Sequence, residues 1–411
     1  MDQDEGRPSH GVEFLDADPT SRNADDVLAV PTHRWPRWLP FLLAAVLIAA
    51  AAGLIVHADS KPSASPPTRP ATTQPAVSAP GTSPTASSPP ASAPPITATQ
   101  LGAPLLGVSA GWELFGRGDE VVVRIELARG RITRTTVPTL GSGGPVSFTT
   151  GNGWTLVRPI DFVPGDLIPD GRPARALNGA LGQGGPAFPG PDRDHIWVQA
   201  GDNAPNRMVL VGVDGRSTGP SLTIPAGSSP LSAVPDQTGY LLFPGLGGVY
   251  DVRPASASRI TTGAVLAVGP TRWLTADCND RARCRAVVTA RASGAQRALD
   301  TRLGEINPQP GVISPDGTKA ALVIQSPSPA IEIIDLATGA AHALSLRIDL
   351  STVDEESMVW SPDSRWLFST DAKGHLDAVN AHTGQITDLT AISGHALPNL
   401  SQIAIGGAPA N

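Results

Sequence analysis

Short apolar runs recur at near-regular intervals from residue 112 onward, and each opens just after a turn. The runs begin at Trp112, Trp154, Ile196, Tyr240, Trp273, Ala321 and Trp366. Successive starts lie roughly 33 to 48 residues apart, which is the spacing of four-stranded propeller blades. Between the runs, β-type segments alternate with Gly, Pro, Asp and Asn turns. The sequence therefore predicts an all-β fold, a single seven-bladed β-propeller over residues 101–411.

Two stretches before residue 101 have compositions that cannot build a core. Residues 1–36 are polar and acidic, which predicts a disordered cytoplasmic tail. An alternative is a short docking peptide for a cytoplasmic regulator, anchored by Phe14 and Leu15 or by the apolar residues 27–30. Residues 58–100 are almost entirely Pro, Ser, Thr and Ala. They predict a disordered or extended linker.

An uncharged apolar run between these stretches predicts a membrane anchor. Residues 39–56 would form a helix of about 27 Å, close to the hydrocarbon thickness of a bilayer. Arg34 and Arg37 precede the run, which favours a cytoplasmic N-terminus. We expect an uncleaved signal-anchor helix over 37–57, and hence a single-pass membrane protein with an extracytoplasmic propeller. The alternative is a signal peptide cleaved after Ala58.

Two units late in the chain repeat most clearly. One contains the turn Ser314-Pro315-Asp316-Gly317 and the other the turn Ser361-Pro362-Asp363-Ser364. Pro presets φ at such a turn, Asp accepts hydrogen bonds from the turn amides, and Gly tolerates positive φ. An apolar strand follows each turn, and a further strand ends before the dipeptide Thr338-Gly339 or Thr383-Gly384.

These turns resemble the Ser-Pro-Asp-Gly repeats of WD-repeat-like and TolB-type β-propellers of bacteria. The resemblance covers two units well and implies the others through spacing. The unit after Trp154 departs most, because Pro159, Pro164 and Pro169 interrupt its third strand. The Gly-His and Trp-Asp signatures of true WD repeats are absent. Arg, Ala, Gly and Pro outnumber Lys, as in proteins of GC-rich bacteria.

A propeller closes best when one blade takes strands from both ends of the domain. The segment Leu400–Ile405 is a strand-like run separated from the last clear unit. We expect it to become the inner strand of the first blade, whose other strands are expected at 112–116, 120–127 and 131–137.

The only two cysteines, Cys278 and Cys284, lie six positions apart across an expected hairpin. Their α-carbons can approach within disulfide range, and oxidation is expected outside the cytoplasm. We therefore predict a disulfide between them. The alternatives are free buried thiols or a redox-active pair.

Motifs for catalysis, metals and cofactors are missing from the sequence. The histidines are scattered without metal-ligand spacing, and there is no Gly-x-Ser-x-Gly elbow. The Gly-rich pieces 141–144 and 182–185 do not lie between a strand and a helix, so phosphate binding is not expected. The net charge of −7 leaves no basic footprint for nucleic acid. We expect no enzyme, no cofactor and no nucleic-acid partner.

Propeller geometry indicates where a binding site would lie. Loops that join outer to next inner strands, and second to third strands, share one face of the ring. The irregular loops at 176–188, 275–285 and 346–357 are of these kinds. They carry charged residues that we interpret either as a solvated surface or as a rim that selects a partner. The rim candidates are Arg281, Arg283, Arg285, Asp354, Glu355 and Glu356. Tryptophans at the repeat positions are expected to pack between sheets rather than to stack on carbohydrate.

The leading hypothesis is a membrane-anchored, extracytoplasmic, non-catalytic propeller that binds a protein or an envelope polymer. A second is an enzyme on the same fold, a lyase or hydrolase with its site at the channel mouth. A third is a transmembrane signalling protein whose acidic tail contacts a cytoplasmic regulator.

Overall fold

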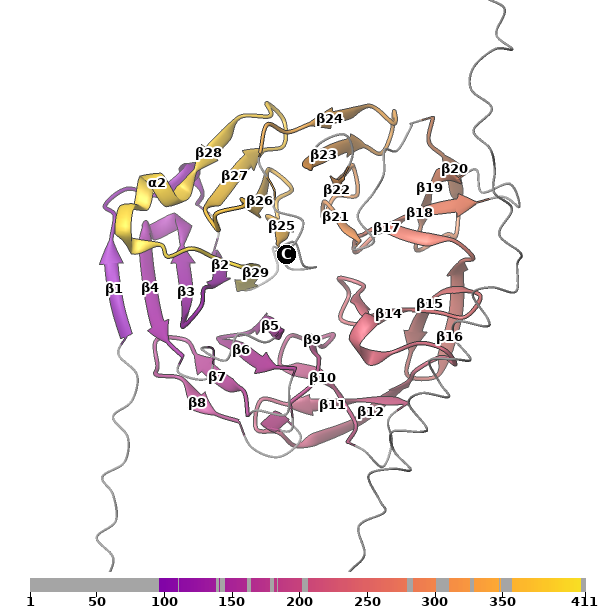
Figure 1. Cartoon of the computed structure of the whole chain (residues 1–411), viewed down its shortest axis with the longest axis horizontal. Helices are drawn as coiled ribbons and strands as arrows, with labels where there is room; N and C mark the ends of the chain where they lie inside the picture. The colour runs from indigo at the N-terminus through magenta and orange to yellow at the C-terminus, as the bar shows by residue number, and fades with distance from the viewer. Residues whose placement is uncertain are drawn as a thin grey trace, which may run out of the picture. The chain divides into compact units, whose positions relative to one another are not determined.

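The computed structural model describes residues 96–407 except 110, 138–139, 141–144, 161–163, 178–180, 183, 202–205, 279–283, 301–309, 326–328, 347 and 349–356. The extended regular structure of the described chain is all β, arranged as sheets around a common centre (Figure 1). Its short helical turns are η1 (Leu105–Gly107), η2 (Leu127–Arg129), η5 (Pro230–Ser232), α2 (Leu389–Ser393) and η6 (Gly394–Ala396). The all-β propeller class predicted from the repeat spacing is confirmed.

Three sheets are formed by the first half of the domain. The first sheet has the order β1 (Ile96–Gln100), β4 (Arg131–Thr136), β3 (Val121–Glu126), β2 (Trp112–Arg117) and β29 (Gln402–Gly407). The second contains β5 (Val146–Gly151), β6 (Trp154–Pro159), β7 (Asp166–Pro169) and β8 (Arg175–Ala176). The third contains β9 (Ala187–Pro189), β10 (His195–Gln199), β11 (Arg207–Gly212) and β12 (Ser217–Thr223). The prolines of the second sheet shorten its outer strands without abolishing them.

The remaining strands form three further sheets. The fourth contains β13 (Val234–Pro235), β14 (Leu241–Gly245), β15 (Gly248–Arg253) and β16 (Ser256–Thr261). The fifth has eight strands: β17 (Ala264–Val268), β18 (Arg272–Cys278), β19 (Cys284–Ala290), β20 (Gln296–Ala298), β21 (Gly311–Ile313), β22 (Lys319–Ile324), β23 (Ala330–Asp335) and β24 (Ala341–Ala343). The sixth contains β25 (Met358–Trp360), β26 (Trp366–Thr370), β27 (Leu376–Asn380) and β28 (Ile386–Asp388).

The prediction of seven separate blades is wrong. The described strands form five separate blades of four or five strands and one continuous eight-stranded sheet. The continuity arises where β17 and β21 pair in parallel, with Ala267 opposite Gly311 and Val268 opposite Val312. Small residues allow this approach, because a Cβ on Gly269 would lie 2.6 Å from the Cβ of Ile313. The apolar runs locate the strands but do not reveal which neighbouring inner strands bond to each other.

The C-terminal strand closes the first sheet, as expected. β29 pairs antiparallel with β2, with Leu114 opposite Ile405 and Arg117 opposite Gln402. The Gln402 side chain also donates to the carbonyl of Val146 in the second sheet, at 2.9 Å. On the outer edge, β1 pairs with β4. The strand Ile96–Gln100 therefore lies inside the stretch expected to be linker, and that expectation is wrong for these five residues.

The predicted transmembrane helix gains no support. Among the described residues, no helix combines the length and the apolar character that crossing a membrane requires. The segment 37–57, where the sequence predicts this helix, lies outside those residues, as do the expected acidic tail at 1–36 and the linker up to residue 95.

The aromatic residues that mark the repeat pack in the core, as predicted. Trp112, Trp154, Trp197, Trp273 and Trp366 all lie on the second strand from the centre of their sheets, and all are buried. Trp112 meets Phe368 of the sixth sheet edge-on, with ring centroids 5.8 Å apart. This contact stabilises the boundary between the first and sixth sheets, so the alternative role as carbohydrate platforms is wrong.

The Ser-Pro-Asp turns join the inner strand to the second strand in the two clearest repeats. The Ser314 hydroxyl donates to Asp316 at 2.6 Å and accepts from the amide of Lys319. Ser361 makes the matching bonds to Asp363 and Trp366. The two turns also touch, because the amide of Asp316 donates to the Ser364 hydroxyl at 3.0 Å.

Candidate functional site

One end of the strands carries the longer and more irregular connections. Successive strands within a sheet are antiparallel. The second-to-third hairpins and the crossings from outer to next inner strands therefore lie at the same end, which we call the loop face. The strands that flank the predicted loops at 176–188, 275–285 and 346–357 end on this face, and each of these segments includes residues outside the described chain.

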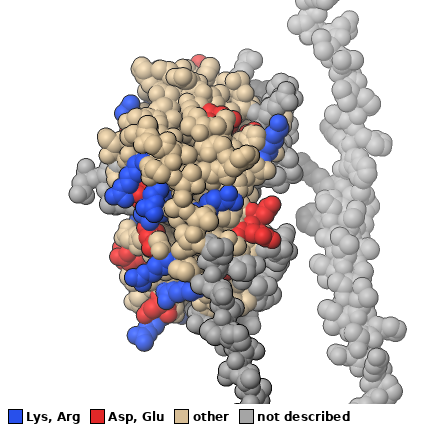
Figure 2. All heavy atoms as spheres, turned by 90° about the vertical axis from the view of Figure 1, so that its left-hand side faces the viewer, with Lys and Arg blue, Asp and Glu red and all other residues tan. Residues whose placement is uncertain are grey.

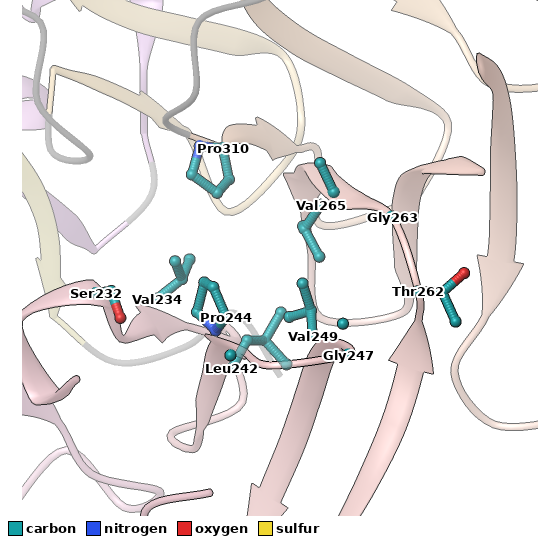
Figure 3. A pocket seen from close by; sticks show the side chains of 13 residues that line it. Ser232, Val234, Leu242, Pro244, Gly247, Val249, Thr262, Gly263, Val265 and Pro310 are labelled. Atoms are coloured by element: carbon teal, nitrogen blue, oxygen red, sulfur yellow. The ribbon is translucent and has the colours of Figure 1, made fainter. Parts of the chain in front are cut away.

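The loop face has a pocket of about 480 Å³ between the fourth and fifth sheets (Figure 3). Its walls are the β14–β15 hairpin, the connection from β16 to β17, the segment that enters β13, and Pro310. The side chains that give it its character are Val234, Leu242, Pro244, Val249, Val265 and Pro310. Among the described residues, none that lines it is charged or aromatic. Its volume falls in the range of about 300–1,000 Å³ typical of ligand pockets.

Short strands and close backbone contacts shape this pocket. β13 has only two residues, so it covers little of the inner edge of β14. On the opposite wall, the Gly263 amide donates to the Thr261 hydroxyl at 3.0 Å, and this hydroxyl donates to Asp277 at 3.0 Å. A Cβ on Gly263 would lie 1.8 Å from the carbonyl oxygen of Ala276, so only glycine fits here.

Exposed leucines adjoin the pocket. In the described part of the chain, three large hydrophobic side chains are exposed: Leu231 (61%), Leu246 (77%) and Ile392 (55%). Leu246 lies at the tip of the pocket-lining hairpin, and Leu231 directly precedes the lining residue Ser232. The Tyr250 hydroxyl holds the hairpin tip by donating to the carbonyl of Leu246 at 3.1 Å. Two of the three exposed hydrophobic side chains therefore belong to residues that directly neighbour pocket-lining residues in the chain.

Only one of the predicted charged rim residues lies in the described chain. Arg285 is exposed on β19, opposite Asp277 of β18. Arg281, Arg283, Asp354, Glu355 and Glu356 lie outside the described residues, so the structure does not show whether the charged loops come together. The same strand pair places Cys278 directly opposite Cys284. That register suits the predicted disulfide, which stays a prediction.

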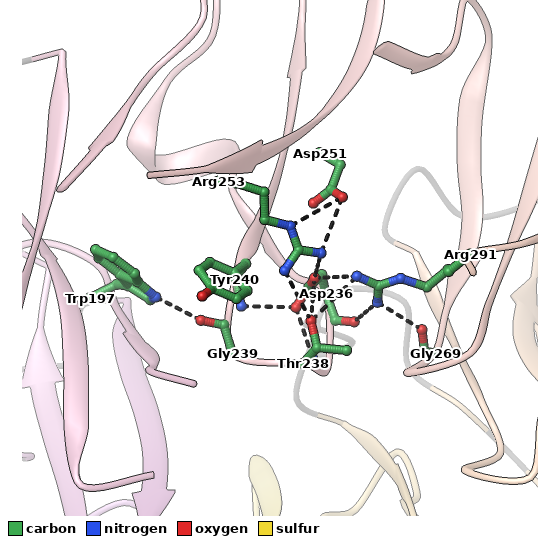
Figure 4. A network of polar contacts seen from close by, with 9 residues as sticks. All are labelled: Trp197, Asp236, Thr238, Gly239, Tyr240, Asp251, Arg253, Gly269 and Arg291. Atoms are coloured by element: carbon green, nitrogen blue, oxygen red, sulfur yellow. Dashed lines mark hydrogen bonds and ion pairs between the residues drawn. The ribbon is translucent and has the colours of Figure 1, made fainter. Parts of the chain in front are cut away.

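A buried polar network occupies the opposite face, at the same sheet boundary (Figure 4). Asp236 is fully buried and pairs with Arg253 at 2.8 Å and with Arg291 of the fifth sheet. The Arg253 guanidinium lies over Tyr240, and that of Arg291 lies over Trp273.

The Asp236 carboxylate is held in its charged form. Burial alone would raise its pKa, but the charge of Arg291 and hydrogen bonds from Thr238, Arg291 and the Tyr240 amide lower it below the ordinary value. With these partners in place, the network joins the fourth and fifth sheets. Sequence reasoning missed it, although Pro235-Asp236 repeats the Pro-Asp turn of the clearest units.

An acidic group lies elsewhere on the loop face, in the sixth sheet. Asp377 of β27 is 6% exposed and stands opposite Asp388 of β28. Burial, then the charges of Asp388 and Asp371, raise the pKa of Asp377 to about 6, while His375 acts in the other direction. No set of three or more His, Cys, Asp or Glu side chains in the described residues has the geometry to hold a metal ion.

The side of the ring around β1 and β4 is charged but balanced. Figure 2 shows basic and acidic side chains interspersed there. Arg124 pairs with Glu113 at 2.6 Å and with Asp170 at 3.3 Å, and Arg129 pairs with Glu126 at 2.7 Å. Pairing of this kind is typical of a solvated surface rather than of a single-sign binding patch.

No family model and no curated protein sequence matches the chain. A structure of a functionally unknown protein from Desulfotomaculum acetoxidans DSM 771 matches at 13% identity and a TM-score of 0.46, over 72% of this chain and 98% of that one. Apo AztD from Citrobacter koseri matches at 13% identity and 0.42, over 67% and 80%. TolB from Acinetobacter baumannii matches at 14% and 0.36, over 68% and 66%.

At these identities and scores the likeness says nothing about function. The resemblance to TolB-type and WD-repeat-like propellers is confirmed for the fold, because the chain's own sheets surround one centre (Figure 1).

Proposed function

We propose that this domain is a non-catalytic binding module that docks a protein partner through the apolar pocket on its loop face. The observation that carries the proposal is that Leu246, which is exposed, lies between the pocket-lining residues Gly245 and Gly247. Exposed apolar surface beside a concave site is typical of a protein contact.

A binding role is also supported by what lines the pocket. In the part of the lining that the structure describes, the polar side chains are the hydroxyls of Ser232 and Thr262, and no titratable group is present to move a proton. The buried Asp236 is engaged by two arginines on the other face. These features favour a binding module over the lyase or hydrolase alternative.

A location outside the cytoplasm remains a prediction from the sequence. The register that sets Cys278 opposite Cys284 supports it, since disulfides persist in oxidising compartments.

Site-specific photocrosslinking in intact cells tests the proposal. A photoreactive residue at Leu246 should give discrete crosslinked products, and these should disappear when Ala264→Trp fills the pocket mouth. Ile392 is the matched control, because it is comparably exposed but lies on α2, far along the chain from the pocket. Equal products from positions 246 and 392, or products at 246 that persist in the filled variant, would count against docking here.

A further inference from the structure

Resting on the proposed function, we propose that the pocket takes a branched aliphatic side chain from an extended segment of a partner protein, and that Arg285 selects segments with a carboxylate beside that side chain. Arg285 is then a specificity-determining residue, separate from the apolar lining that supplies most of the contact.

The residues that line the pocket support the proposed preference for a branched aliphatic side chain. Val234, Leu242, Val249 and Val265 present aliphatic carbon and no charge. Aliphatic surfaces gain about 25 cal/mol for each Å² of apolar area removed from water, so they suit Leu, Ile or Val side chains. Sugars and proline-rich segments are usually bound on aromatic side chains, and none lines this pocket. The chain's own Pro-rich linker is therefore a poorer occupant than an aliphatic segment.

The position of Arg285 supports the proposed preference for a neighbouring carboxylate. Gly263 of the pocket wall packs against Ala276 and the α-carbon of Asp277. Asp277 faces the fourth sheet, because it accepts a hydrogen bond from Thr261 of β16. Arg285 stands directly opposite Asp277 on the neighbouring strand, so its side chain lies on the same face of the fifth sheet, the face turned toward the fourth sheet.

Arg285 is also uncommitted. It is exposed, and no ion pair to it is formed in the part of the chain that the structure describes. Asp277 is already engaged by Thr261. A guanidinium binds a carboxylate through two parallel hydrogen bonds, which gives direction as well as charge. An exposed arginine beside an uncharged pocket is therefore complementary to an aliphatic side chain with an acidic neighbour.

Four labelled hexapeptides test this with the full-length chain by fluorescence polarisation. They share a Gly-Ser frame and differ at the two central positions: Leu-Asp, Leu-Asn, Leu-Lys and Ser-Asp. The native protein should bind Leu-Asp about two- to five-fold more tightly than Leu-Lys, a preference of the size expected for an exposed ion pair. Ser-Asp should bind most weakly, because it leaves the pocket empty.

Charge reversal at one position identifies the residue responsible. Arg285→Glu should reverse the order of Leu-Asp and Leu-Lys. Arg175→Glu is the matched control, an exposed strand arginine on β8 in the second sheet, and it should leave the order unchanged. Ala264→Trp should weaken every Leu peptide. Leu246→Asp serves as a second pocket variant if the first changes the thermal melt.

The outcomes separate this inference from the proposed function. If the pocket variants abolish Leu-peptide binding but Arg285→Glu leaves the preference intact, the role of Arg285 is overturned and docking stands. If the Leu peptides bind no better than Ser-Asp, both fail. If an anionic polysaccharide such as alginate binds, Arg285→Glu abolishes that binding and none of the peptides binds, the loop face binds a polymer and the peptide inference is overturned.

Discussion

Asp236 of the fourth sheet and Arg291 of the fifth sheet form a buried ion pair, and Arg291 also donates to the backbone carbonyl of Asp236 at 2.6 Å. The pair joins two sheets at the end of the strands opposite the pocket. Arg253 approaches the same carboxylate from the other side. The boundary between the fourth and fifth sheets is therefore stabilised by a buried ion pair on one face, and it carries the apolar pocket on the opposite, loop face.

Removing the carboxylate should destabilise the domain strongly. We expect Asp236→Ala to lower the free energy of unfolding by roughly 3 to 5 kcal/mol, because Arg291 would be left buried beside an empty space. Asp236→Asn should cost less, since an amide oxygen can still accept from the amides of Thr238 and Tyr240. Urea unfolding followed by tryptophan fluorescence measures both, and equal stability of Asp236→Ala and the native protein would refute the assignment.

The direction of the Asp236 pKa shift predicts how the stability of the domain depends on pH. The pKa of Asp236 is lowered in the folded state, so the stabilisation is present above the ordinary Asp range and is lost as pH falls through the lowered pKa. Acid unfolding of Asp236→Asn should therefore be less steep than that of the native protein.

Asp377 should behave in the opposite way. Its pKa is raised to about 6 in the folded state, so folding is most favourable when the carboxyl is protonated, and this advantage is lost as pH rises from roughly 4 to 6. At neutral pH, Asp377→Asn should raise the free energy of unfolding by about 1 kcal/mol after allowance for solvent screening.

Thermal melts between pH 4 and 8 check this prediction, because the gain should shrink toward pH 4. Asp335→Asn is the contrasting control. That carboxylate accepts hydrogen bonds from the amides of Ala337 and Thr338, which lower its pKa, so its loss should destabilise the protein at neutral pH. A pH-independent effect of Asp377→Asn would contradict the raised pKa.

Closure by β29 predicts a sharp boundary for truncation. Removing residues 402–411 would expose the inner edge of β2 and take Ile403, which is 2% exposed, out of the core. We expect loss of cooperative unfolding and aggregation, since an open strand edge pairs with other chains. Removing only residues 408–411 is the control and should leave the melt unchanged. A cooperative, monomeric product of the longer truncation would argue against closure.

The Cys278–Cys284 bond is tested by thiol chemistry. Alkylation of the unfolded, unreduced protein should modify neither cysteine, and reduction should expose both. Replacing both with serine should lower the free energy of unfolding by about 2 kcal/mol, the contribution expected for a loop this short. Two free thiols in protein isolated from its own compartment would exclude the bond.

Repeat spacing was a good guide to the strands of this domain. It placed the first-sheet strands within one residue of β2, β3 and β4 and foresaw that a C-terminal segment closes the sheet. It could not foresee the continuous fifth sheet, because the β17–β21 pairing depends on how closely Gly269, just after β17, approaches Ile313 of β21. Nor did composition reveal β1, whose residues are mostly exposed and resemble the linker before them.

The candidate site was predictable only in part. Topology alone predicted the loop face, because in antiparallel sheets successive connections lie alternately at the two ends of the strands. The pocket itself depends on the two-residue length of β13 and on Pro310, which lies far along the chain from Val234. Residues that are distant in the chain and meet only in the folded domain leave no local pattern in the sequence. The same is true of Asp236 and Arg291, which lie 55 positions apart and meet only across a sheet boundary.

The union of β2 with β29 also sets an order of events during synthesis. Arg117 and Gln402 face each other across this pair although 285 positions separate them. A ribosome adding about 5–20 residues per second needs roughly 15 to 60 seconds to make the chain between them. During that interval the earlier sheets can form one by one, but the ring cannot close because β29 has not yet been synthesised.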